Sequence, residues 1–206
     1  TATNIQTLQV VSQIKSKATA EKESLGGVVG VYSATQRTIT GLQVSPVIVV
    51  ESKGSAVGNI GSIVGEYTAG TIANSKVYFT NLGDDYSQKE KINIYVSGLI
   101  KANLGGLVGL VSGSAAKELK YSYLRSFYNN DIQKGRYAGN IFVLACDEAY
   151  VGGIAGVVSG ESDLVNITSN VSVKANYYSE VVTTATNYCD FLETSSGYDL
   201  NIIDKL

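Results

Sequence analysis

The sequence predicts an all-β protein that folds as a right-handed parallel β-helix, a solenoid of about four repeats. Two observations carry this prediction: a glycine-rich pattern recurs four times, and β-branched runs flank its copies. The composition agrees, because the 206 residues include 22 Gly and 14 Tyr but a single Pro, which is typical of strands joined by turns.

The recurring pattern is an apolar residue, Gly, Gly or Ser, two apolar residues and Gly. Its copies span residues 25–30, 60–65, 104–109 and 151–156, and their first glycines are 35, 44 and 47 residues apart. A unit of this length cannot bury both faces alone, whereas stacked copies can. Glycines at this spacing let the chain bend at a corner or let the next layer approach closely. The predicted structural glycines are Gly26, Gly27, Gly30, Gly61, Gly65, Gly105, Gly106, Gly109, Gly152, Gly153 and Gly156.

Strands are expected on both sides of each copy. The preceding runs are residues 47–50, 92–100 and 141–144, with a weaker one at 10–14. Turns follow the copies at residues 33–35, 68–70, 112–114 and 159–161, and then strands at 38–44, 72–81, 119–127 and 164–175. Residues 1–24 are expected to lead into the first coil as a strand or a short helix, residues 25–178 to form the solenoid, and residues 179–206 to form a degenerate last repeat or a connection.

Composition excludes several classes of function. The chain has 16 basic and 18 acidic residues, a formal charge of −2, and only three Arg, so we expect no nucleic-acid partner. It has no His, which excludes a Ser-His-Asp triad and His-ligated zinc. No apolar run is long enough to span a membrane. We therefore expect no catalytic residues, no cofactor and no metal.

The glycine pattern, followed by a turn and an Ile-x-Asn-Ser-x-Val strand, resembles the GLUG repeat. The best copy covers residues 63–77 and contains Asn74 and Ser75, while the copy from 151 to 160 matches in its glycine half. The resemblance covers residues 25–178. GLUG repeats occur in large surface and secreted proteins, including adhesin-like proteins, so the resemblance implies an extracellular scaffold or adhesive segment.

Two cysteines and two sequons are candidates for modification. Cys146 and Cys189 are 43 residues apart, within the range of the repeat intervals, so a disulfide between adjacent coils is one reading and two buried thiols are the other. Asn166 and Asn170 begin Asn-x-Thr and Asn-x-Ser triplets, predicted to lie on one face of one strand. They are either glycosylation sites or chance triplets in an Asn- and Ser-rich chain.

Tyrosines and carboxylates are the remaining candidates. Tyr121 and Tyr123 alternate on a predicted strand near Tyr128, and Tyr177 and Tyr178 follow one repeat later. Aromatic rows of this kind bind sugars or proteins, or simply pack over loops. Candidates for acid-base catalysis are Asp84, Asp85, Asp131, Asp147, Glu148, Glu161 and Asp163. These carboxylates are scattered over different repeats, so solvated turn residues are the favoured explanation.

We therefore expect a non-enzymatic structural or adhesive segment of a larger surface or filament protein, outside the cell. Its expected partners are other repeats or protomers of the same protein, glycans, and host or cell-surface proteins. Two alternatives stay open: a β-helical polysaccharide lyase or glycoside hydrolase, and a fibre subunit that stacks end to end. For the fibre, the apolar ends would be Val10, Val11 and Ile14, and Ile202, Ile203 and Leu206.

Overall fold

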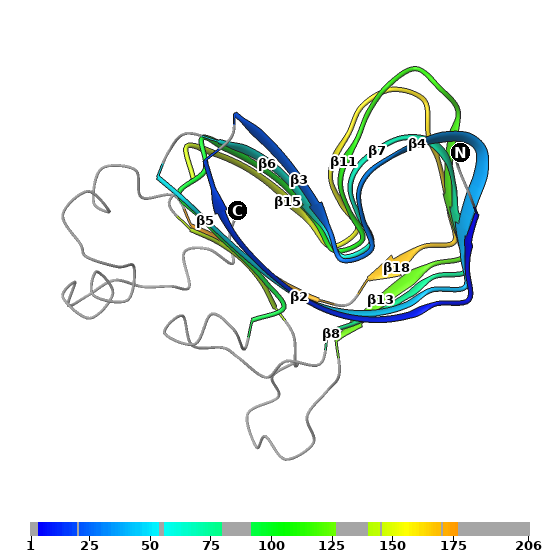
Figure 1. The fold of residues 1–206 in the computed structure, drawn as a ribbon, viewed down its shortest axis with the longest axis horizontal. Helices are drawn as coiled ribbons and strands as arrows, with labels where there is room; N and C mark the ends of the chain where they lie inside the picture. The colour runs from blue at the N-terminus through cyan, green and yellow to red at the C-terminus, as the bar shows by residue number, and fades with distance from the viewer. Residues whose placement is uncertain are drawn as a thin grey trace, which may run out of the picture.

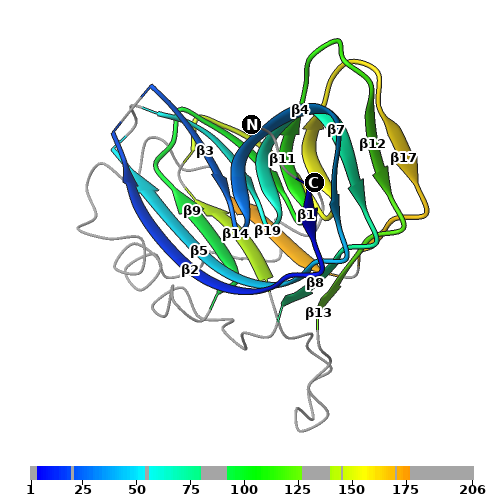
Figure 2. The same ribbon diagram turned by 45° about the vertical axis from the view of Figure 1, so that its right-hand side comes forward.

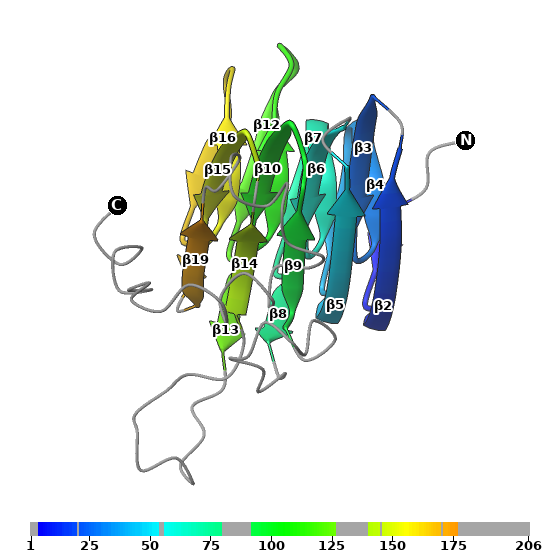
Figure 3. The same cartoon turned by 90° about the vertical axis from the view of Figure 1, so that its left-hand side faces the viewer.

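The computed structural model describes residues 4–19, 21–53, 56–79, 92–126, 140–144, 146–169 and 171–176. These residues form nineteen β-strands in three parallel sheets, wound as the predicted right-handed parallel β-helix. Figure 1 looks along the stack, and the chain travels clockwise in it from β2 (Gln9–Ala18) toward β3 (Lys22–Gly26) and β4 (Val29–Thr40). Figure 3 shows the coils advancing side by side from β2 to β19 (Ser172–Asn176).

Each coil passes through the three sheets in the same order: sheet B, sheet C, sheet A. Sheet B contains β2, β5 (Gln43–Ser52), β8 (Lys76–Phe79), β9 (Ile94–Ser97), β13 (Tyr123–Ser126), β14 (Asn140–Leu144), β18 (Thr168–Ser169) and β19. Sheet C contains β3, β6 (Val57–Gly61), β10 (Lys101–Gly105) and β15 (Glu148–Gly152). Sheet A, seen in Figure 2, contains β1 (Ile5–Gln6), β4, β7 (Val64–Ala73), β11 (Val108–Val111), β12 (Lys117–Lys120), β16 (Ala155–Val158) and β17 (Asp163–Val165).

The glycine motif forms the bend between sheets C and A. The first glycine ends a strand of sheet C, and the next two residues turn the chain before sheet A begins. The bend points inward toward sheet B (Figure 1), and a Cβ on Gly27 would lie 3.3 Å from the Cβ of Pro46 in β5. The last glycine of each copy packs against a strand of sheet C: a Cβ on Gly109 would lie 2.3 Å from the Ile60 nitrogen. The predicted glycine strand is therefore a bend whose two arms touch through backbone atoms.

The predicted strands at residues 38–44, 72–81, 119–127 and 164–175 are wrong as continuous strands. Each is broken where sheet A meets sheet B, at one residue with positive φ: Gly41 (68°), Asn74 (49°), Tyr121 (50°) and Asn166 (51°). Thr7 (48°) occupies the same position before the first coil. Backbone bonds join successive corners, as when the Asn74 N–H donates to Lys120 O at 3.1 Å. We name the coils between these corners the first (9–41), second (43–74), third (76–121) and fourth (123–166).

The corner position predicts a stabilising substitution. Tyrosine in the left-handed region costs about 1 kcal/mol or more, whereas Asn adopts it readily. Because Tyr121 is 54% exposed, Tyr121→Asn loses little burial, and we expect the free energy of unfolding to rise by about 1 kcal/mol. Urea denaturation measures this change. Tyr121→Ala is the control, since it removes the ring but keeps the strain; an equal gain in both variants would contradict the explanation.

The difference in repeat length lies mostly in sheet B. Gln43 is in register with Lys76 and Tyr123, and Ile48 with Ile94 and Ile141. The two positions are thus 5 residues apart in the second coil but 18 apart in the third and fourth, an insertion of 13 residues each time. Both insertions lie between two strands of sheet B: the first between β8 and β9, and the second between β13 and β14. Residues 80–91 and 127–139, which belong to these insertions, lie outside the described residues.

The interior is filled by apolar side chains from all three sheets. Ile48, Ile60, Val64, Leu104 and Val108 are 0% exposed and belong to one cluster. Residues 9–18 form a strand, β2, with alternating burial instead of a helix. Val10 and Ile14 turn inward and are half-buried, whereas Val11 turns outward and is 80% exposed. Ile202, Ile203 and Leu206, predicted for the other end, lie outside the described residues, so the apolar ends stay a prediction.

Candidate functional site

Cys146 lies directly after β14 and is buried. Its Sγ donates to Leu144 O at 3.5 Å, and burial raises the pKa of the thiol to about 11. Cys189 lies outside the described residues, so the disulfide stays a prediction.

Asn166 is exposed at the corner between β17 and β18, and Asn170 lies outside the described residues. The chain between them is not one strand, so the expectation of a shared strand face is wrong. Tyr121 is itself a corner residue and Tyr123 begins β13, so the two tyrosines do not alternate along one strand. Tyr128, Tyr177 and Tyr178 lie outside the described residues.

A polar depression lies on sheet A, where loops interrupt the third and fourth coils. Its volume is about 770 Å³, and it is lined by Gln36, Gly70, Thr71, Ala116, Lys117, Glu118, Gly160, Glu161, Ser162 and Asp163. Register places Thr71, Glu118 and Asp163 side by side on three adjacent strands. Sequence reasoning predicted Glu161 and Asp163 but missed Glu118, whose proximity follows only from the register. The other predicted carboxylates are not brought to this depression: Asp147 and Glu148 are exposed near β15, and Asp84, Asp85 and Asp131 lie outside the described residues.

A neighbouring lysine, Lys120, partly neutralises the negative charge in the depression. Lys120 Nζ donates to Glu118 Oε2 at 2.7 Å, which holds the pKa of that carboxyl below its usual range and raises the pKa of Lys120. Thr71 Oγ1 also donates to Glu118 Oε2, at 3.3 Å. Lys117 is 2% exposed, and its Nζ donates to the Gly113 and Ala115 carbonyls at 2.7 Å each, which closes the loop before β12. The depression thus offers acceptors to a ligand that donates hydrogen bonds.

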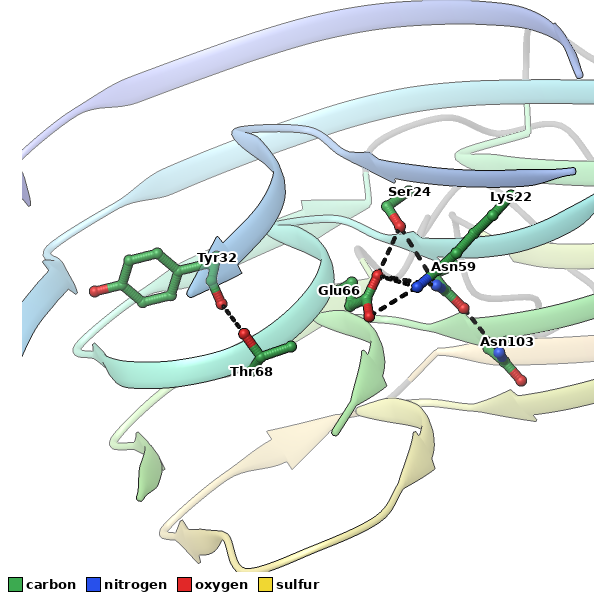
Figure 4. Close-up of polar contacts among 7 residues, drawn as sticks. All are labelled: Lys22, Ser24, Tyr32, Asn59, Glu66, Thr68 and Asn103. Carbon is green, nitrogen blue, oxygen red and sulfur yellow. Dashed lines mark hydrogen bonds and ion pairs between the residues drawn. The ribbon is translucent and has the colours of Figure 1, made fainter. Parts of the chain in front are cut away.

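A second polar cluster lies between the two arms of the glycine bend (Figure 4). Glu66 accepts from Lys22 Nζ at 2.9 Å and from Ser24 Oγ at 3.2 Å. Asn59 Nδ2 donates to Ser24 Oγ at 3.3 Å and to Glu66 at 3.5 Å, and Asn103 Nδ2 donates to Asn59 Oδ1 at 2.8 Å. Asn59 and Asn103 are buried, so these bonds tie the first three coils together. We call the hydrogen bonds that run from Ser24 through Asn59 to Asn103 the ladder. The sequence contains a signal for it, because both Asn residues lie two positions before the first glycine of a copy.

Tyrosine side chains inside sheet A link the first and second coils. Tyr32 and Tyr67 stack with ring centroids 5.7 Å apart, and Thr68 Oγ1 donates to Tyr32 O at 3.4 Å (Figure 4). The Tyr67 hydroxyl oxygen accepts from the Glu118 N–H at 3.1 Å. Its single hydrogen can be donated to either of two carbonyl oxygens, Gly70 O or Glu118 O, of which the latter is 3.0 Å away. The Tyr67 hydroxyl thus lies at the break between β11 and β12, two strands that both pair with the continuous strand β7.

Tyr67 predicts a dependence of stability on alkaline pH. Burial raises the pKa of the Tyr67 hydroxyl in the folded protein, whereas a tyrosine in the unfolded chain has a pKa of about 10. Its contribution is therefore complete below about pH 10 and is lost as pH rises above that value. We expect Tyr67→Phe to lower the free energy of unfolding by about 1–2 kcal/mol at neutral pH, and the difference from the parent to shrink above pH 10. Denaturation at pH 7–11 checks this; a difference that is constant with pH would contradict it.

Within the described residues, no group of three or more His, Cys, Asp or Glu side chains is placed to hold a metal ion, and no helix is long and apolar enough to cross a membrane. Comparison of the chain with protein-family models, with curated proteins and with solved structures finds no match.

Proposed function

We propose that this chain is a non-enzymatic structural repeat segment of an extracellular or cell-surface protein, of the GLUG-repeat type. In this role the solenoid is a rigid spacer, and its outer faces and loops are adhesive surfaces that bind glycans or cell-surface proteins.

The observation that carries the proposal is what the repeated residues do. The last glycine of each copy faces backbone atoms of sheet C, which would lie 2.3–2.7 Å from an added Cβ. These glycines are Gly30, Gly65, Gly109 and Gly156. The recurring part of the sequence is therefore used for stacking one coil on the next, while the residues that differ between repeats lie on the surface and in loops. This division is typical of repeat scaffolds.

Glu118 in the depression is poorly suited to act as a general acid. Glu118 and Asp163 are register partners on adjacent strands, and both line the depression, as a glycosidase pair would. A general acid, however, needs a raised pKa, and the bond from Lys120 lowers the pKa of Glu118. This favours a binding surface over the glycoside hydrolase alternative.

Two experiments test the proposal. An antibody against the chain should label intact, unpermeabilised cells of the source organism or its secreted fraction; labelling only after permeabilisation would contradict the extracellular role. Polysaccharides incubated with the purified chain should keep their length. Cleavage that is abolished by Glu118→Gln or Asp163→Asn, with Glu148→Gln as the control outside the depression, would establish the enzyme alternative instead.

End-to-end association is a second candidate function, favoured by the first coil. Leu25, Val28 and Val29 are half-buried there, whereas Ile60, Ile63 and Val64, their counterparts in the second coil, are 0% exposed. Strands β2 and β3 are also edge strands among the described residues, and the outer side of β4 is paired only with the two-residue strand β1. Such edges accept further strands. Sedimentation of the chain should show concentration-dependent association that Val28→Lys weakens. A monomer at every concentration would rule this candidate out.

A further inference from the structure

Two adjacent strands of sheet B present an alternating pattern of aromatic and cationic side chains on their outer face. Lys76 and Tyr78 come from β8, and Tyr123 and Arg125 come from β13. Register pairs Lys76 with Tyr123 and Tyr78 with Arg125, so each ring lies beside a cation on the next coil. The intervening Val77 and Leu124 are 0% and 1% exposed, which places the other four side chains on the outside of the solenoid. We call these four residues the tyrosine–cation face.

The rings hold the cations in place. Arg125 Cζ lies 4.8 Å from the centroid of the Tyr123 ring, and Lys76 Nζ lies 5.7 Å from it. Tyr78 and Tyr123 pack edge to face with centroids 6.0 Å apart, and their hydroxyl oxygens are 2.9 Å apart. Because a guanidinium over a ring keeps its N–H groups at its edge, Arg125 retains its donor fork for an anion, with less side-chain entropy to lose on binding.

In the part of the chain that the structure describes, no carboxylate is paired with the cations of this face. Among the residues that the structure describes, the ion pairs join Lys22 to Glu66, Lys101 to Glu148 and Lys120 to Glu118, and none involves Lys76 or Arg125. The flanking residues in register are uncharged: Gln43 next to Lys76 in the second coil, and Thr168 next to Tyr123 after the fourth. Lys76 and Arg125 thus lie together without an ion-pair partner among the described residues, on a chain of net charge −2.

The ligand that fits this face is anionic and rich in hydroxyl groups. A carboxylate or sulfate can accept from the Arg125 fork and the Lys76 ammonium. Gln43 and Thr168 offer neutral hydrogen-bonding groups, which match sugar hydroxyls. The row from Gln43 through Lys76 and Tyr123 to Thr168 runs along the stack, so a linear polymer can cross several coils. Nucleic acid fits less well, because its affinity depends on many phosphate contacts.

We propose that the tyrosine–cation face binds an anionic polysaccharide that carries carboxylate or sulfate groups. This inference rests on the adhesive role proposed above and names the ligand class for it. The two can fail separately: cleavage of the bound polysaccharide would contradict the non-enzymatic function, whereas a surface-located chain that binds no anionic sugar would contradict only the ligand.

The test is calorimetric titration of the full 206-residue chain with oligogalacturonate and with heparin oligosaccharides. We expect at least one of them to bind, binding to weaken as salt is raised, and neutral cello-oligosaccharides to bind at least about tenfold more weakly. The variant Lys76→Gln/Arg125→Gln should lose about tenfold or more in affinity. The matched control Arg37→Gln/Lys53→Gln removes the same charge from exposed positions elsewhere and should change the affinity less than about twofold.

A further variant separates the charge of Arg125 from the geometry of its guanidinium group. Arg125→Lys keeps the charge but loses the fork, and should bind with intermediate affinity while melting like the parent. An equal loss in the control variant would mean that bulk charge, not this face, binds the polymer, and would overturn the proposal. So would tighter binding of a single-stranded oligonucleotide than of either sugar polymer, or the absence of binding by both.

Discussion

Gly109→Ala is expected to reduce the free energy of unfolding by about 3 kcal/mol or more, or to prevent folding. A Cβ at this position would lie 2.3 Å from the Ile60 nitrogen, 2.6 Å from Gly65 O and 2.8 Å from the Asn59 carbonyl carbon. All three are backbone atoms of the neighbouring coil, so no side chain can move aside to make room. The two arms of the bend would have to separate, which would expose the core residues Leu107 and Val108. Urea denaturation followed by circular dichroism measures the loss.

Gly41→Ala is the matched control for this prediction. Gly41 has a φ of 68°, but the nearest atom to its would-be Cβ is 3.5 Å away, so alanine there suffers strain without a clash. We expect a loss of about 1 kcal/mol, and a smaller loss for Gly41→Asn, because Asn occupies the same corner at positions 74 and 166. If Gly109→Ala costs no more than Gly41→Ala, close backbone packing does not explain the glycine motif.

Asn59→Leu should lower the free energy of unfolding by about 2–4 kcal/mol. Asn59 is 0% exposed and is the central member of the ladder, because it donates to Ser24 and Glu66 and accepts from Asn103. Its loss leaves the buried Asn103 amide without an acceptor and removes a donor from the Glu66 carboxylate.

The double variant Asn59→Leu/Asn103→Leu separates hydrogen bonding from shape. Replacing both partners by apolar side chains leaves no orphaned amide, so the double variant should be more stable than Asn59→Leu alone. Thermal melting of the parent, both single variants and the double variant gives the coupling free energy. Strictly additive losses would show that the bond between Asn59 and Asn103 contributes nothing.

The solenoid could be predicted because its cause is repeated along the chain. Gly26, Gly61, Gly105 and Gly152 mark the same point of successive coils, and in the structure they are partners in register. The corners could not be predicted in the same way. Asn74 and Tyr121 lie inside runs with continuous strand character, and a single positive φ redirects the chain without changing that pattern.

The polar clusters were harder to predict because most of their contacts depend on register between segments more than 40 residues apart. Asn59 and Asn103 meet only because their glycines align, and Glu118 meets Asp163 only because the longer third and fourth coils stay in phase. Tyr78 was not singled out, although it pairs with the predicted Tyr123, because an insertion of 13 residues follows both strands and hides their equivalence in the sequence.

The central claim is that the coils are equivalent stacking units, and removal of one coil tests it most directly. Gln43 and Lys76 are register partners, so deletion of residues 43–75 joins Leu42 to Lys76 and keeps every remaining side chain in phase. We predict that this shortened chain folds and unfolds cooperatively, with strand content per residue equal to that of the parent. Deletion of residues 43–76 removes one residue more and turns inward-facing side chains outward, so that chain should not fold. Two deletions that behave alike in circular dichroism and urea denaturation, both folded or both unfolded, would contradict the claim.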